Sequence, residues 1–127
     1  MSFKSCIIGT GSCLPERILS NEDLEEIVDT SDEWITRRTG IKGRRISSVD
    51  RKESSTDLGT RAALKAMQMA DVSPESLDLI ILGTVTPDHQ FPSAACMVQK
   101  EINAVNAGAF DVSAGCTGFL YAGMDVT

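Results

Sequence analysis

The chain has 127 residues, of which 42% are hydrophobic and 24% charged, and its net charge is −6. The apolar content excludes an intrinsically disordered chain, the lack of an 18-residue apolar run excludes a membrane-spanning helix, and the scarcity of aromatic residues together with the acidic balance argues against nucleic-acid binding. The length fits one domain with its own core, and since no export signal is evident the expected location is the cytoplasm.

A strand is expected at the N-terminus. Residues 3–9 are predicted to form it, and the Gly9-Thr10-Gly11 sequence is predicted to end it. The Gly-x-Gly pattern is not a dinucleotide-binding fingerprint, because no third glycine follows and Pro15 stands where the helix should open.

Two short helices and a loop are expected next. Ser20 is predicted to cap a helix over 21–28, whose first turn carries the acidic residues that the helix dipole favours. Ser31 is expected to begin a second helix, which Gly40 ends. Residues 41–48 are basic and are predicted to form an exposed hairpin or extended loop.

Three further helices are expected in the rest of the chain. The first runs from a cap at Ser55 or Thr56 to about Ala70. It carries a stripe of small residues that suits close packing on a sheet. The second covers about 93–102 after Pro92, and the last is opened by Gly115-Cys116-Thr117-Gly118.

Two apolar runs between these helices are predicted to be strands. Leu77–Val85 and Ala107–Ser113 are typical of strands that are buried on both faces of a parallel sheet. Strands that alternate with helices predict the α/β fold class with crossover connections. Since no linker or repeat is evident, residues 1–127 are predicted to form one structural unit.

The charge is unevenly distributed. Residues 37–52 hold seven of the twelve Lys and Arg residues and only one acid, so this window carries +6 and the remaining chain −12. Such a block is either a solvated face or the place where an anionic ligand or partner binds, such as a phosphate-bearing cofactor.

The four cysteines, Cys6, Cys13, Cys96 and Cys116, contain no C-x-x-C pair, and His89 is the only histidine. No metal site is therefore expected. In a reducing cytosol these thiols are free, and most are expected to pack as small apolar side chains.

Cys116 differs from the other three because it lies between a predicted strand and a predicted helix, with Gly115 and Gly118 on either side. Small neighbours allow a sharp turn at the carboxyl end of the strand, where α/β folds place ligands. Unpaired N–H groups at a helix start favour the thiolate and could stabilise an oxyanion. Spacing alone also fits, and on balance favours, a buried structural cysteine. A hydrolase elbow has similar spacing, but nothing places His89 near Cys116 as its base.

Trp34 is the sole tryptophan and stands near Arg37 and Arg38. The ordinary expectation for a tryptophan is a place in the core. An indole beside guanidinium groups could equally grip a purine ring and its phosphates. His89 lies in a turn-like loop and is expected to be a surface or structural residue.

Six motifs occur in the order found in a known family: Ile8-Gly9-Thr10-Gly11, Asn21-x-Asp23-Leu24, Thr30-Ser31-Asp32-Glu33-Trp34-Ile35, Arg38-Thr39-Gly40-Ile41, Phe91-Pro92-Ser93-Ala94-Ala95 and Phe110-Asp111-Val112-Ser113-Ala114-Gly115-Cys116-Thr117-Gly118-Phe119. Together they closely resemble the N-terminal part of the β-ketoacyl-acyl carrier protein synthase III family, thiolase-fold enzymes that start bacterial fatty acid synthesis. The motif with Trp34 and Arg38 is the most specific, since related thiolases and polyketide synthases share mainly the cysteine region.

The resemblance implies a thiolase-like, layered α/β/α fold, of which this chain covers most of the first half. It implies that Cys116 takes an acyl group from acetyl-CoA or a similar short acyl-CoA, and that the acyl-enzyme condenses with malonyl-acyl carrier protein. Thr30, Trp34 and Arg38 match positions near the nucleotide of coenzyme A, which is a substrate here, so no cofactor is expected. Phe91 matches the residue that closes the acyl pocket across a homodimer.

The resemblance also implies what these 127 residues lack. The family uses a histidine and an asparagine from its C-terminal half for decarboxylation, and His89 does not match that histidine. We therefore expect an incomplete N-terminal domain that does not complete condensation by itself. The alternative is a non-catalytic, coenzyme A-binding thiolase-like fragment, and a cysteine hydrolase is a third hypothesis.

Overall fold

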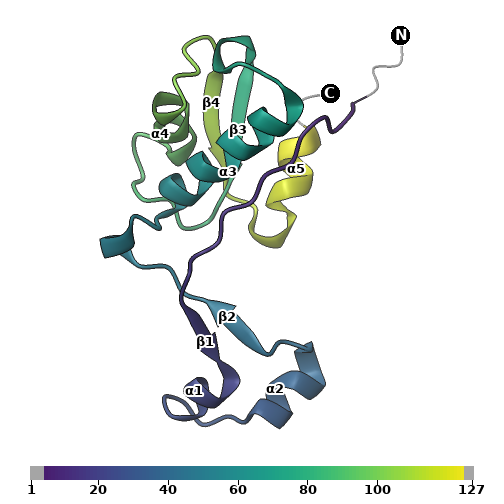
Figure 1. The fold of residues 1–127 in the computed structure, drawn as a ribbon, viewed down its shortest axis with the longest axis vertical. Coiled ribbons are helices and arrows are strands. Elements are labelled where there is room, and N and C mark those ends of the chain that lie inside the picture. The colour runs from purple at the N-terminus through teal and green to yellow at the C-terminus, as the bar shows by residue number, and fades with distance from the viewer. Residues whose placement is uncertain (1–4, 125–127) are drawn as a thin grey trace. The chain divides into compact units, whose positions relative to one another are not determined.

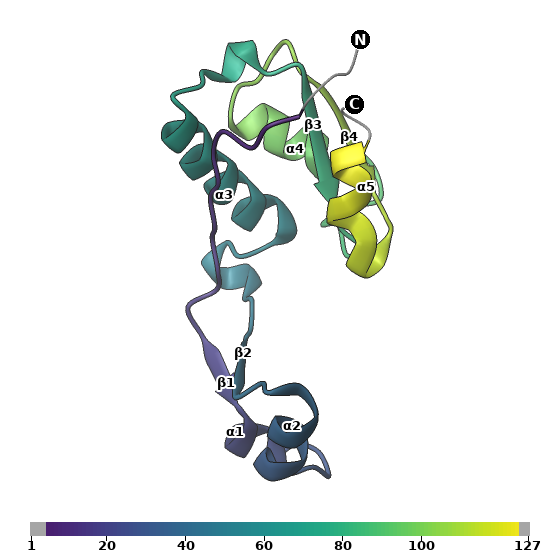
Figure 2. The ribbon, with the colours of Figure 1, turned by 90° about the vertical axis from the view of Figure 1, so that its right-hand side faces the viewer.

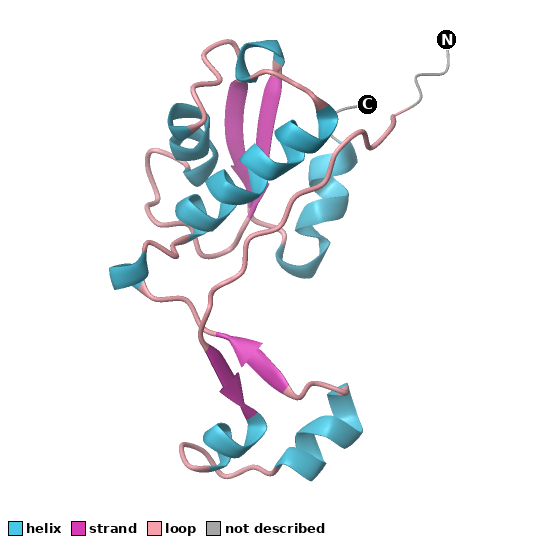
Figure 3. Ribbon diagram, in the orientation of Figure 1, coloured by secondary structure: helices cyan, strands magenta, loops and turns pink. Residues whose placement is uncertain are grey.

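The computed structural model describes residues 5–124 (Figure 1). The sequence shows no linker and predicts one structural unit, but the chain groups into two compact units. The smaller unit is Leu14–Glu53, and the larger unit combines residues 1–13 with 54–127. Each has its own two-stranded sheet (Figure 3). Within the described part of the chain, no helix combines the length and the apolarity needed to cross a membrane.

The smaller unit is a short antiparallel ribbon that carries two helices. Strand β1 (Ile18–Ser20) pairs with β2 (Gly43–Arg45). Helices α1 (Asn21–Glu25) and α2 (Asp32–Thr39) lie between these strands in sequence. A 3₁₀ turn, Val49–Arg51, follows β2.

The caps predicted for these helices are present. Ser20 and Asp23 form a reciprocal capping box, in which the Asp23 N–H donates to Ser20 Oγ at 3.0 Å and the Ser20 N–H donates to the Asp23 carboxylate at 2.9 Å. Ser31 Oγ accepts from the N–H of Trp34 at 3.1 Å, and Gly40 ends α2 in the left-handed region with φ 71°. Only the length of α1 differs from the prediction, since the helix ends at Glu25 and gives way to a turn.

The smaller unit is organised around a buried amide. Asn21 has no exposed surface, and its Nδ2 donates to Asp32 Oδ1 and to the carbonyl of Ile41, both at 2.7 Å. Its Oδ1 accepts from Arg44 at 2.7 Å. The hydrogen bond from Asn21, followed by one from Thr36, holds the pKa of Asp32 below its usual value. One side chain thus ties α1 to α2 and to β2.

Polar groups make up much of what this unit buries. Its buried residues, among those whose side chains are described, are Pro15, Asn21, Ile35 and Glu53. The Glu53 carboxylate accepts from the N–H groups of Glu16 and Ser48, at 3.2 and 2.9 Å. Hydrogen bonds rather than an apolar core therefore hold the smaller unit together.

The larger unit is built on two parallel strands. Strand β3 (Leu79–Gly83) pairs in register with β4 (Gly108–Val112). Helices α3 (Ser55–Ala70) and α4 (Ala94–Glu101) lie on one side of the strands and α5 (Gly118–Met124) on the other (Figure 2). The layered α/β/α arrangement predicted from the sequence is therefore confirmed.

The apolar core of the larger unit lies between α3, α4 and the sheet. Its buried members are Val98, Ile102, Ala104 and Ala107, against which Met67, Leu82 and other apolar residues pack. The strands are shorter than predicted, and the expectation that both faces are buried is wrong. Leu79 is 37% exposed and Phe110 is 40% exposed, because the sheet formed by the described residues of the larger unit has only two strands.

The predicted strand over 3–9 is also wrong for residues 5–9, and residues 3 and 4 lie outside the described part. Residues 5–9 have no ladder partner and run as an extended segment against α3. A Cβ at Gly9 would lie 2.8 Å from Ala70 Cβ, and one at Gly11 would lie 2.6 Å from the nitrogen of Ala66. The small-residue stripe on α3 thus packs closely on this backbone rather than on a strand.

Helix α3 begins one residue earlier than predicted, because Ser54 is its cap. Ser54 forms a capping box with Asp57. Asp88 joins them, accepting from Ser54 Oγ at 2.9 Å and from the N–H of Thr56 at 3.2 Å. Burial alone would raise the pKa of Asp88, but hydrogen bonds from Thr56 and Ser54 outweigh it and lower this pKa.

Candidate functional site

Cys116 is exposed at the end of β4. It lies in a 3₁₀ turn, Gly115–Thr117, which directly precedes α5, so the predicted helix start at Gly115-Cys116 is wrong and Cys116 lies outside that helix. Gly115 has φ 53°, a conformation that side chains disfavour, so the chain turns sharply just before the thiol. Because Cys116 is exposed, the prediction of a buried structural cysteine is wrong.

Two glycines set the height of this turn above the sheet. A Cβ at Gly83, the last residue of β3, would lie 3.2 Å from the carbonyl carbon of Gly118. A Cβ at Gly118 would in turn lie 3.5 Å from the Cα of Gly83. The start of α5 therefore rests directly on the backbone of β3. This contact also fixes the position of the turn that carries the Cys116 thiol.

The loops after β3 and β4 leave the sheet at the same edge, since the strands are parallel. The pairing continues one step further, with the N–H of Thr84 donating to the carbonyl of Val112 at 3.1 Å. The first loop carries Phe91, which is 91% exposed. The peptide bond between Phe91 and Pro92 is cis. The second loop carries Cys116. The two candidate residues of the larger unit thus lie on neighbouring loops.

Asp111, which the sequence analysis did not single out, fixes the first of these loops. From β4 its carboxylate accepts from the N–H groups of Ala94 and Ala95, at 2.8 and 2.7 Å. These are the first two residues of α4, so Asp111 supplements the Ser93 cap of that helix. The only available signal was an acid inside an apolar strand, which is costly to bury without partners.

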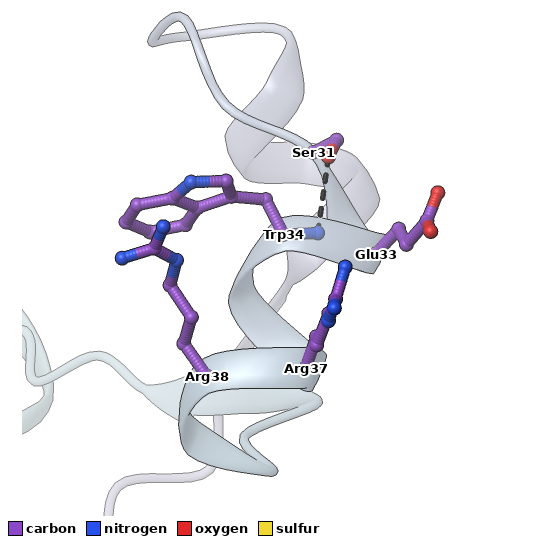
Figure 4. Close-up of a pocket in the computed structure, with 5 residues that line it drawn as sticks. All are labelled: Ser31, Glu33, Trp34, Arg37 and Arg38. Carbon is purple, nitrogen blue, oxygen red and sulfur yellow. Dashed lines mark hydrogen bonds between the residues drawn. The ribbon is translucent and has the colours of Figure 1, made fainter.

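Trp34 and Arg38 form a stacked pair on α2. The Cζ atom of Arg38 lies 4.6 Å from the centroid of the indole ring (Figure 4). Trp34 is 54% exposed, whereas the buried residue of α2 is Ile35, so the expectation that Trp34 is a core residue is wrong.

The indole borders two open pockets. One has a volume of about 580 Å³, and its lining is Ser31, Glu33, Trp34, Arg37 and Arg38. The other, of about 370 Å³, has Thr30 in its lining together with Asp29, Ser31 and Trp34. The structure therefore places Thr30 and Arg38 in the linings of two pockets that share the side chain of Trp34, within the smaller unit. Cys116 and Phe91 belong to the larger unit.

Most bases of the +6 window have partners inside the smaller unit. Lys42 pairs with Asp32 at 3.4 Å, Arg45 donates to the carbonyl of Pro15 at 2.8 Å, and Arg51 pairs with Glu16 at 3.7 Å. Arg44 is bound to Asn21, and Lys52 also has a partner. Much of the basic block therefore has a structural role. In residues 5–124, no cluster of His, Cys, Asp or Glu could hold a metal ion.

The fold of the chain is thiolase-like. It superimposes with a TM-score of 0.88 on the crystal structure of 3-oxoacyl-[acyl-carrier-protein] synthase III from Aquifex aeolicus, at 57% identity, covering 94% of this chain and 38% of that one. It superimposes with a TM-score of 0.86 on the priming β-ketosynthase of the R1128 polyketide pathway, at 38% identity, covering 91% of this chain and 34% of that one.

No family model matches the sequence. Comparison with individual curated proteins nevertheless agrees with the structural comparison. The chain is 59% identical over 115 residues to the β-ketoacyl-[acyl-carrier-protein] synthase III of Caldanaerobacter subterraneus subsp. tengcongensis, covering 91% of this chain and 34% of the relative. It is 58% identical to that of Aquifex aeolicus, covering 91% and 37%.

The chain is therefore similar to β-ketoacyl-acyl carrier protein synthase III over nearly its whole length, and the resemblance seen in its motifs is confirmed. It spans about a third of the length of the curated relatives it matches, which fits the N-terminal portion predicted from the sequence.

Proposed function

We propose that this chain is part of a β-ketoacyl-acyl carrier protein synthase III that starts fatty acid synthesis. In the first half-reaction the Cys116 thiolate attacks the thioester carbonyl of a short acyl-CoA such as acetyl-CoA, and coenzyme A leaves as its thiolate. In the second, malonyl-acyl carrier protein loses carbon dioxide, and the resulting carbanion attacks the acyl-cysteine. The products are a 3-oxoacyl-carrier protein and the free thiol. The covalent intermediate divides one difficult step into two easier ones.

Support for Cys116 as the nucleophile comes from its exposure. The thiol is open to solvent beyond the carboxyl end of a parallel sheet, where α/β folds bind ligands. Small residues surround it, so an acyl-CoA chain could approach the sulfur.

The observation that carries the proposal is the grouping of Thr30, Trp34 and Arg38. An exposed indole with a guanidinium stacked on it and pockets beside it suits a purine nucleotide. We therefore assign these three residues to the nucleotide portion of coenzyme A, which acts as a substrate and not as a resident cofactor.

Phe91 is assigned to the acyl pocket of a partner subunit in a homodimer. Its nearly complete exposure supports this assignment, because an aromatic side chain of that size gains much by being covered. Acyl-CoA and malonyl-acyl carrier protein are thus the proposed substrates, and the cytoplasm is the location that this chemistry implies.

Condensation is assigned to the longer protein and not to these 127 residues. His89 is the only histidine in the sequence, and it does not match the histidine that assists decarboxylation in the family. We expect the purified chain to form no 3-oxoacyl product from acetyl-CoA and malonyl-acyl carrier protein. Product formation above the rate seen with the Cys116→Ser variant would contradict this.

The test of the first half-reaction is the intact mass after incubation with acetyl-CoA. We expect one acetyl adduct on the chain, absent in Cys116→Ser. Cys6→Ser is the matched control, since Cys6 is also exposed, and it should keep the adduct. An adduct that survives Cys116→Ser would refute the assignment. Coenzyme A binding without any adduct would favour the non-catalytic alternative, and steady release of acetate would favour a hydrolase.

A further inference from the structure

Arg37 stands apart from the other bases of its window. In the part of the chain that the structure describes, its side chain has no hydrogen bond or ion pair, whereas Lys42, Arg45 and Arg51 all have partners. Arg38 is committed to the stack on Trp34. Arg37 thus carries guanidinium donors that nothing in the smaller unit uses.

Arg37 lines the same pocket as Trp34. Arg37 and Arg38 both lie in the last turn of α2, and Figure 4 shows their side chains extending back toward the preceding turn, Arg38 toward Trp34 and Arg37 toward Glu33. All four residues line the same pocket of about 580 Å³. Two guanidinium groups against one carboxylate give this pocket a net positive charge, next to an aromatic face.

We infer that Arg37 binds a phosphate group of the nucleotide whose base lies near Trp34, and that it sets the preference of the site for phosphorylated ligands. A guanidinium presents several N–H donors in a fixed fork that matches phosphate oxygens. This inference rests on the proposed function, since it assumes that the pocket receives coenzyme A. It adds a residue outside the three assigned there, and it gives that residue a separate task.

Removing the charge of Glu33 should change the affinity for a phosphorylated ligand in the direction opposite to removing the charge of Arg37. It lies four residues before Arg37 on α2 and lines the same pocket, yet the two side chains form no ion pair. A carboxylate there repels a bound phosphate. Removing the charge of Glu33 should therefore strengthen the binding of a phosphorylated ligand, whereas removing the charge of Arg37 should weaken it.

The experiment uses the single tryptophan, Trp34, as the reporter. Its fluorescence is titrated with coenzyme A, with 3′-dephospho-coenzyme A and with adenosine. For coenzyme A we expect Arg37→Gln to raise Kd about fivefold and Glu33→Gln to lower it about twofold, the range of exposed charge pairs. Neither variant should change Kd for adenosine. Both effects should shrink as salt is raised from about 0.05 to 0.5 M, because ions screen exposed charges.

The truncated ligand identifies which phosphate is bound. If the effect of Arg37→Gln disappears with 3′-dephospho-coenzyme A, the contact is with the 3′-phosphate; if it persists, the contact is with the diphosphate. Both results support the inference. Arg51→Gln, which removes the same charge outside the pocket lining, should leave every Kd unchanged, and Arg37→Lys should recover part of the affinity for coenzyme A.

Three results would overturn the inference. An unchanged Kd for coenzyme A in Arg37→Gln would do so while leaving the proposed function intact. An equal loss of affinity for adenosine would show that Arg37 supports the fold of the pocket and not the phosphate. If the wild-type chain gives no saturable response to coenzyme A, both this inference and the assignment of the nucleotide site fail.

Discussion

Replacing Asn21 by alanine should unfold the smaller unit selectively. The change removes a buried amide that donates to the carbonyl of Ile41 and accepts from Arg44, each at 2.7 Å. A neutral hydrogen bond contributes about 1 kcal/mol and one to a charged group about 1.5–3 kcal/mol, so these two bonds alone predict a loss of about 2–4 kcal/mol. That is a large fraction of the stability of a small domain.

The assay is urea unfolding followed by two probes. Trp34 fluorescence reports on the smaller unit alone, because the only tryptophan lies there. Far-UV circular dichroism is dominated by the longer helices of the larger unit. We expect Asn21→Ala to lower the fluorescence midpoint strongly and the circular dichroism midpoint much less.

Asn106→Ala is the matched control. Asn106 is exposed in the larger unit and donates to the carbonyl of Glu75 at 2.8 Å, so its loss should cost about 1 kcal/mol at most and leave the fluorescence midpoint unchanged. A loss below about 0.5 kcal/mol in Asn21→Ala would mean that water replaces the amide without cost. The argument that this side chain holds the smaller unit together would then be refuted.

Three more predictions concern single features of the two units. Gly83→Ala should push the start of α5 away from β3, at a cost of about 1–3 kcal/mol in the free energy of unfolding. It should also change the rate at which iodoacetamide alkylates Cys116. An unchanged alkylation rate and an unchanged urea midpoint would contradict the close contact between Gly83 and Gly118. Asp111→Ala should remove two bonds from the start of α4, costing about 1–2 kcal/mol and speeding amide hydrogen exchange at Ala94 and Ala95, whereas equal exchange in variant and wild type would exclude such a role. Because the folded-state pKa of Asp32 is lowered from 3.8, its contribution to stability is complete above that value and is lost as the pH falls through the lowered pKa. The urea midpoint of the smaller unit should therefore fall below about pH 4, and less so in Asp32→Asn, with equal slopes in both proteins arguing against the assignment.

Features set by local sequence were predicted well. Ser20, Ser31 and Gly40 act within one helical turn, so their residue types suffice to place the start of α1 and both ends of α2. The alternation of apolar runs with helices likewise predicted the parallel pairing of β3 and β4, since a strand followed by a helix returns in the same direction.

Features that depend on residues distant in the sequence were not predicted. The apolar residues at 5–9 satisfy the pattern of a strand, but a strand exists only with a neighbour to pair with, and here the glycines instead meet α3. Asp111 binds a helix that begins 17 residues earlier, which no local pattern records. The charge window was real, yet sequence could not separate Arg44, which is bound to Asn21, from Arg37, which lines a pocket.

The candidate site was predicted residue by residue from motifs, while its geometry came from the fold. The sequence assigned Thr30, Trp34 and Arg38 to one nucleotide site by resemblance, but that Arg38 rather than Arg37 stacks on the indole became visible only in three dimensions. For Cys116, spacing favoured burial, whereas the positive φ of Gly115 and the contact between Gly83 and Gly118 leave the thiol exposed.

The hydrogen-bonded interior of the smaller unit has a thermodynamic consequence. With Asn21 and Glu53 among its few buried residues, unfolding exposes little apolar surface and much polar surface. Exposed apolar surface raises the heat capacity and exposed polar surface lowers it, so the heat-capacity change of this unit should be small for its length. Its stability curve is then flat and its thermal transition broad. Cooling should weaken the larger unit, with its apolar core, before it weakens the unit that carries Trp34.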